Sequence, residues 1–200
     1  VFQGKFQKLL SSVEVRFFIL LNILVAFFIF LTTASFAPHL WAEELRDAFF
    51  QTVAVSTTTG LMTADFDAYP LASKYLLFVC MFIGGCAGST AGGLKVSRVL
   101  LVFKRCIQEL RLTLHPQEVV STKLGKQTVS RRVLSSVFIF FCSYFLLYMF
   151  GVLIMCLLGL DWVSAASSVV AALSSVGPGF GAVGPTQSYN FVHPIGKMVL

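Results

Sequence analysis

Charged residues are scarce in this sequence: they make up 12% of its 200 residues. A soluble domain of this length usually carries about a quarter. Hydrophobic residues reach 56%, and 21 of the residues are phenylalanine, more than a soluble fold of this size could bury. The composition therefore excludes an ordinary soluble domain and predicts a polytopic membrane protein.

Paired cysteines and catalytic clusters are also lacking. The five cysteines form no CxxC pair and lie mostly in apolar runs, so they are interpreted as small core residues and not as a disulfide scaffold or zinc site. The three histidines are isolated and each adjoins a proline, which favours solvated or interfacial side chains over metal ligands. Because no Ser/His/Asp or Cys/His arrangement is found, we expect no catalytic site and no enzyme activity.

Two glycine patterns imitate nucleotide-binding motifs. Residues 179–184 match GxGxxG, but Pro185 and a polar loop follow where a helix would have to begin. Residues 88–95 resemble a phosphate loop but lack the Gly-Lys-Ser/Thr ending. The spacing of Gly84, Gly88 and Gly92 also fits a helix-packing motif, although the additional glycines favour a broken helix.

Apolar runs of different lengths alternate along the chain. Residues 17–37 and 133–160 are long enough to span a bilayer, which takes about 20 residues. A further helix is expected from Pro70 to Ile83, a break at 84–93 with five glycines in ten residues, and a helix again over 94–112. The runs at 47–56 and 161–174 are too short to span, and Pro194 opens a last helix. The chain ends inside that apolar stretch, so we expect it to be part of a longer protein.

This order repeats: long helix, short helix, glycine-bearing loop, proline, helix. Sliding the sequence by 117 positions places Gly60 on Gly177 and Ala54 on Ala171. Internal duplication is typical of membrane transport proteins. We therefore predict an all-α fold with one repeat at 1–112, a basic linker at 113–132 and a second, C-terminally truncated repeat at 133–200.

The distribution of charge predicts the orientation. Nine of the fifteen Lys and Arg residues lie between Lys95 and Arg132, and three more precede the first long helix, so both regions are expected in the cytoplasm. Six of the nine acids flank the short helices on the opposite side. Positive-inside bias explains the basic stretch better than a nucleic-acid patch does, so no nucleic-acid partner is expected.

A short helix that enters the membrane and returns as extended backbone is tolerated only where it is buried in protein or lines a wet cavity. In such a pore loop, carbonyl oxygens can replace the water around a cation. The short helix directs the negative end of its dipole at the same place, and acids at the outer mouth attract cations. Together these features predict cation transport.

Three motifs make the resemblance specific. Residues 56–61 (STTTGL) resemble the third filter of the Trk/Ktr/HKT potassium transporters, and 175–179 (SVGPG) resemble the fourth filter of its TrkH branch. Residues 81–95 (MFIGGCAGSTAGGLK) are similar to that family's broken helix. The resemblance implies four repeats around one pore, of which this chain would hold the third and most of the fourth. Two departures, Ala91 for glycine and Ser175 for asparagine, are small.

By resemblance, potassium would bind along two filter strands, formed by Thr58, Thr59, Gly60, Leu61, Ser175, Val176, Gly177 and Pro178. A gate would lie in the broken helix, at Gly84, Gly85, Gly88, Ser89, Thr90, Gly92, Gly93 and Lys95. The resemblance also implies a bacterial inner-membrane location, a homodimer and a cytoplasmic nucleotide-binding regulatory subunit. Two questions stay open: whether Lys95 is a membrane anchor or a gate charge, and whether the chain is instead a non-conducting structural subunit.

Overall fold

The computed structural model describes residues 12–34, 41–114, 123–124 and 127–200. The N-terminal lysines, Pro38, His39, His115 and half of the predicted linker lie outside these residues. The described chain is helical apart from β1 (Lys123–Leu124) and β2 (Gln127–Thr128), a two-residue antiparallel pair. The predicted all-α fold class is confirmed.

In the part of the chain that the structure describes, two helices are long and apolar enough to cross a membrane, α2 (Val13–Ala34) and α6 (Arg131–Leu157). Both expose large apolar side chains, as expected of helices in an apolar medium. On α2 and α6 these include Leu20, Leu24, Phe27, Leu31, Leu146, Leu147 and Phe150.

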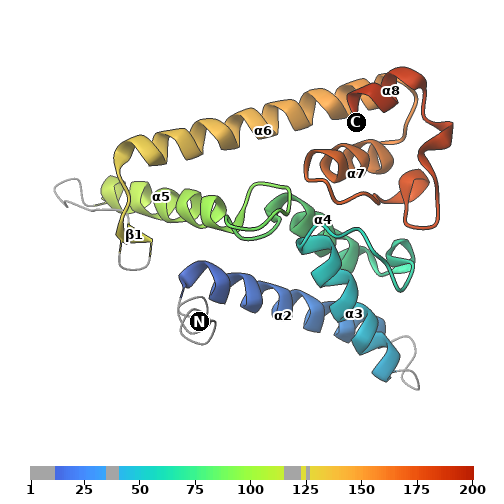
Figure 1. Cartoon of the computed structure of the whole chain (residues 1–200), viewed down its shortest axis with the longest axis horizontal. Coiled ribbons are helices and arrows are strands. Elements are labelled where there is room, and N and C mark those ends of the chain that lie inside the picture. Colours follow the sequence, from blue (N-terminus) through green and yellow to red (C-terminus); the bar gives the residue numbers. More distant parts are fainter. Residues whose placement is uncertain (1–11, 35–40, 115–122, 125–126) are drawn as a thin grey trace, which may run out of the picture.

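A third span is broken, as predicted. Helix α4 (Leu71–Ile83) follows Pro70 and ends at Gly84, and α5 (Val96–Leu114) resumes after the glycine-rich segment. In Figure 1, α2, α5 and α6 run side by side along the long axis, and β1 lies at one end of them.

The short helices gather toward the other end (Figure 1). Helix α7 (Trp162–Leu173) has the predicted bounds, flanked by its caps Asp161 and Ser174. Helix α3 (Trp41–Ser56) begins six residues before the predicted start at Asp47. Its first turn contains Glu43 and Glu44, whose negative charge stabilises a helix N-terminus, so residues 41–46 are part of the helix.

The remaining elements are short. The loop after α3 contains the 3-10 helix η2 (Phe66–Ala68), and the loop after α7 contains η3 (Gly181–Val183) and η4 (Tyr189–Phe191). Helix α8 (Pro194–Val199) begins with proline in its first turn, as predicted.

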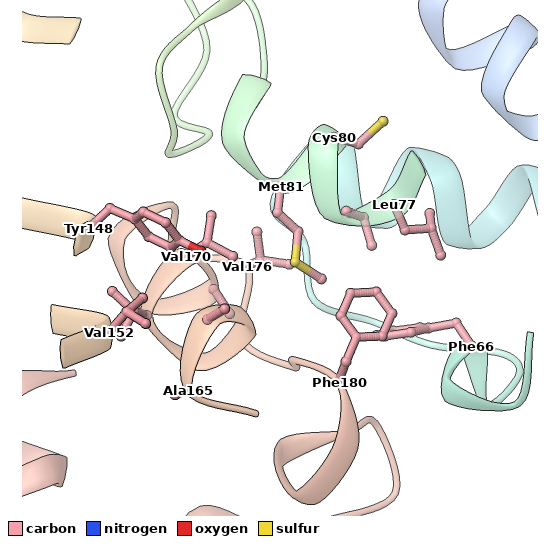
Figure 2. Close-up of a cluster of buried hydrophobic side chains, with 14 of the residues drawn as sticks. Phe66, Leu77, Cys80, Met81, Tyr148, Val152, Ala165, Val170, Val176 and Phe180 are labelled. Carbon is pink, nitrogen blue, oxygen red and sulfur yellow. The ribbon is translucent and has the colours of Figure 1, made fainter. Parts of the chain in front are cut away.

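The core joins the two halves of the chain. Figure 2 shows Leu77 and Met81 of α4 directed toward Val176 and Phe180, which follow α7. Phe66 and Phe180 meet edge to face with ring centroids 5.2 Å apart, and Phe66 is fully buried. Apolar packing therefore holds the segments after the two short helices beside each other.

Candidate functional site

Helices α3 and α7 end in the same way. The residue after each helix cap has a left-handed backbone, with φ 56° at Thr58 and 55° at Ser175. Each end closes with the paired hydrogen bonds of a Schellman motif: Thr58 N–Val55 O (3.1 Å), Thr59 N–Ala54 O (2.9 Å), Ser175 N–Ala172 O (3.0 Å) and Val176 N–Ala171 O (2.8 Å). These bonds recur at the 117-residue offset found in the sequence.

Threonine and serine are unusual in this left-handed position, because the steric strain that a side chain adds there normally favours glycine. Strained backbone of this kind concentrates at functional sites. Gly60 (φ 72°) and Gly177 (φ 108°) continue the parallel, two residues beyond Thr58 and Ser175. Neither segment is part of a continuous helix.

The two segments lie side by side. A Cβ added to Gly60 would stand 2.4 Å from the carbonyl oxygen of Val176, closer than real Cβ atoms approach. The ring of Pro178 lies next to the same point, with Cδ at 3.8 Å. Only glycine fits at position 60, because this contact is with backbone that cannot rotate away.

Four residues of these segments are exposed in this chain: Thr59, Leu61, Ser175 and Gly177. Val176 is buried in the core instead, where its side chain fixes the strand (Figure 2). The second segment is therefore held by the core at Val176, while other residues of both segments are accessible from outside this chain. The C-terminal ends of α3 and α7, which carry partial negative charge, meet the same region.

A buried hydrogen bond from a long helix supports each short helix at its end. Ser56 Oγ donates to Asn22 Oδ1 of α2 at 2.6 Å, and the hydroxyls of Ser174 and Tyr144 of α6 are 2.7 Å apart. Sequence reasoning missed these supports. The available signal was a polar residue inside an apolar span, which usually has a named partner.

Serines on α7 hold the loop that follows the second segment. Ser167 Oγ accepts from Phe180 N at 2.8 Å, and Ser164 Oγ accepts from Ala182 N at 2.9 Å. Both serines are buried and lie three residues apart, on one face of the helix. This spacing in an otherwise apolar helix was the sequence signal for them.

Asp67 links the loop after α3 to the loop after α7 by a hydrogen bond. Asp67 Oδ2 accepts from Gly181 N at 3.2 Å, a contact across 114 residues, and Asp67 Oδ1 pairs with Lys74 Nζ at 3.0 Å. Asp67 is one of the six acids that flank the short helices, and both of its carboxylate oxygens have partners within the chain.

The glycine-rich segment forms a loop with a closed neck. Three backbone bonds join its two sides: Leu94 N–Phe82 O (2.9 Å), Lys95 N–Ile83 O (2.9 Å) and Val96 N–Gly85 O (3.1 Å). Gly84 and Gly85 are buried at this neck, where Gly93 also lies, whereas Gly88, Ser89 and Thr90 are exposed at the tip. The predicted break in the helix is confirmed.

The far side of the loop lies against both filter-like segments. Gly92 N donates to Thr58 Oγ1 at 3.0 Å. A Cβ on Gly92 would stand 1.9 Å from the carbonyl oxygen of Ser174, so the loop touches the end of α7 with no room for a side chain. The structure thus brings Gly92, one of the predicted gate residues, against Thr58 of one predicted binding segment and against Ser174, directly before the other.

Two charged residues, Lys95 and Glu14, form hydrogen bonds with the backbone of the glycine-rich loop. Lys95 Nζ donates to Ser89 O at 3.0 Å and also to Ala91 O, so its charge lies against the loop. Glu14 of α2 accepts from Ala87 N at the tip. Lys95 has a left-handed backbone, with φ 71°.

Asp161 caps α7 at its outer end. Its carboxylate accepts from Ser164 N at 3.1 Å, and hydrogen bonding with Ser164 lowers the pKa of Asp161 below its ordinary value. The carboxylate thus stays ionised at the positive end of the helix dipole.

Comparison with known proteins places these features in one family. The family profile described as TrkH, cation transport protein, matches residues 5–200. The chain is 42% identical to the Trk system potassium uptake protein TrkH of Escherichia coli (strain K12) over 156 residues, which are 78% of this chain and 32% of that protein. It is 31% identical to TrkG of the same strain over 96% of this chain and 39% of that protein.

A solved structure agrees. The crystal structure of the potassium transporter TrkH from Vibrio parahaemolyticus matches with a TM-score of 0.87 and 36% identity, covering 96% of this chain and 41% of that one. The chain spans about a third of the length of the TrkH relatives that it matches.

Proposed function

This chain belongs to the TrkH family of cation transport proteins and is an integral membrane protein, and on that premise we propose that it carries part of a potassium-uptake pathway. The relatives named above are potassium uptake proteins, which supports a transport role for this chain and no enzyme activity. The chain would supply the third and most of the fourth pore repeat of a longer protein. The repeat bounds 1–112 and 133–200, with the linker 113–132, belong to this proposal.

The observation that carries the proposal is the meeting of two equivalent segments. The same hydrogen-bonded turn ends α3 and α7, and the segments that follow approach until Gly60 touches the carbonyl of Val176. Potassium would shed its water and bind to backbone oxygens along Thr58–Leu61 and Ser175–Pro178.

The glycine-rich loop supports a gate. It contacts Thr58 and Ser174, where each filter strand leaves its pore helix, so an ion that passes the filter meets the loop next. Movement of the loop, with its neck held by backbone bonds, would open the path. Lys95 and Glu14 would set how firmly the loop stays in place.

A potassium-flux measurement tests the proposal. Full-length protein in vesicles should take up potassium or rubidium, and Gly60→Ser or Gly177→Ser should weaken discrimination against sodium. Absence of rubidium flux in the unmodified full-length protein would favour a non-conducting structural subunit. Unchanged selectivity in both variants would contradict the filter assignment.

The partners are part of the same proposal. The family resemblance supports a homodimer in the bacterial inner membrane and a nucleotide-binding regulatory subunit on the basic cytoplasmic face. Two repeats do not close a four-sided pore, so we expect no conduction by this chain without the remaining repeats. Co-purification of the full-length protein tests the dimer and the regulatory subunit.

A further inference from the structure

A tyrosine outside the predicted filter holds one of its carbonyl oxygens. The hydroxyl of Tyr189, in η4, donates to the carbonyl oxygen of Gly177 at 2.9 Å. The Tyr189 ring packs against the core, and burial raises the pKa of the phenol to about 12, so the hydroxyl remains a donor at neutral pH.

The peptide that this bond holds has few other means of support. It joins Gly177 to Pro178, and proline has no N–H, so the peptide can be anchored by hydrogen bonds only through its carbonyl oxygen. In this chain no atom lies within 4 Å of the point where a Cβ of Gly177 would stand, so no side chain packs against the backbone from that direction. Without the phenol, rotation of this peptide would be limited by little besides the φ of proline.

The other filter strand differs at this point. Leu61 follows Gly60 where Pro178 follows Gly177, and leucine keeps its N–H. Sliding the sequence by 117 positions places Tyr189 on Ala72, which has no hydroxyl. The tyrosine therefore accompanies the strand that contains proline, and the duplicated segments are held by different means.

We propose that Tyr189 is a positioning residue that fixes the Gly177 carbonyl in its ion-facing orientation and thereby contributes to selectivity for potassium over sodium. This inference rests on the proposed function. A carbonyl oxygen has two lone pairs, so one can accept from the phenol while the other faces the cation. Holding the oxygen still disfavours the inward collapse that a smaller ion would need.

The test compares Tyr189→Phe with the unmodified full-length protein in proteoliposomes, by measuring potassium and sodium uptake separately. Phenylalanine keeps the ring and its packing and removes one hydroxyl. We expect the potassium-to-sodium ratio to fall roughly two- to tenfold, the scale of one lost hydrogen bond. The thermal midpoint of the purified protein should change little.

Tyr75→Phe is the matched control. Tyr75 lies on α4 and is 65% exposed, so loss of its hydroxyl should leave the ratio unchanged. A wild-type ratio in Tyr189→Phe, with normal expression, overturns the inference and reduces Tyr189 to a packing residue. If the unmodified protein carries no potassium, the proposed function fails first, so the two failures are distinguishable.

Discussion

The bond between the glycine-rich loop and Thr58 of the proposed filter gives the most informative prediction. Thr58 Oγ1 accepts from Gly92 N at 3.0 Å, in a partly buried position. Thr58→Val removes the acceptor but keeps the shape and the β-branching of the side chain, so the strain of a left-handed backbone at φ 56° stays the same. The variant therefore isolates the hydrogen bond.

The magnitude follows from the unpaired donor. A buried N–H left without a partner costs about 1–3 kcal/mol, and the partial burial here places the cost at ~1–2 kcal/mol. That cost falls on the arrangement in which the loop touches the filter. If this arrangement is the closed state, the equilibrium shifts toward opening by a factor of roughly 5–30.

The assay is the initial rate of rubidium uptake by full-length protein in vesicles without a regulatory partner. Thr58→Val should raise this basal rate by up to the same factor, and Thr58→Ser, which keeps the hydroxyl, should behave like the unmodified protein. The potassium-to-sodium ratio, measured alongside, reports whether the filter is intact. A basal rate that stays unchanged or falls in Thr58→Val, with the ratio preserved, would refute the view that this bond keeps the loop closed.

Two further predictions concern the acids. Asp67→Ala removes the acceptor of Gly181 N, so the potassium-to-sodium uptake ratio should fall about fivefold. Asp67→Asn retains an acceptor oxygen, so this ratio should change little. Equal losses of apparent potassium affinity in both variants would instead favour a cation-attracting charge. Asp161→Ala should destabilise the protein by ~1 kcal/mol, seen as a lower thermal midpoint, and Asp161→Asn by much less because asparagine also caps helices. The pKa of Asp161 is lowered in the folded state, so its contribution to stability is present above the ordinary carboxyl pKa of 3.8 and is lost as the pH falls through the lower folded pKa. If the thermal midpoint of Asp161→Asn has the same acid dependence as that of the unmodified protein, this reasoning is contradicted.

Helix positions were largely predictable from the sequence. Proline and glycine mark the start and end of α4, and Asp161 marks the start of α7, because these residues act on the local backbone. The start of α3 was predicted wrongly at Asp47, because the apolar run begins there, whereas the acids before it stabilise the helix N-terminus.

The residues that support the site were not predictable in the same way. Tyr189 lies 12 residues from Gly177, and Asp67 lies 114 residues from Gly181. No local pattern joins either pair, because a hydrogen bond between distant segments depends on how the helices pack. Asn22 had a weak signal as a polar residue in an apolar helix, but its partner Ser56 did not follow from the sequence.

The membrane class, the order of long and short helices, the break at the glycines and the duplication were all predictable from the residues, since each depends on composition or on residues near in the chain. The contacts of Gly60 with Val176 and of Gly92 with Ser174 became visible only in the folded chain. Those contacts arise from the packing of α4 against α7, which brings backbone atoms from distant segments so close that side chains are excluded.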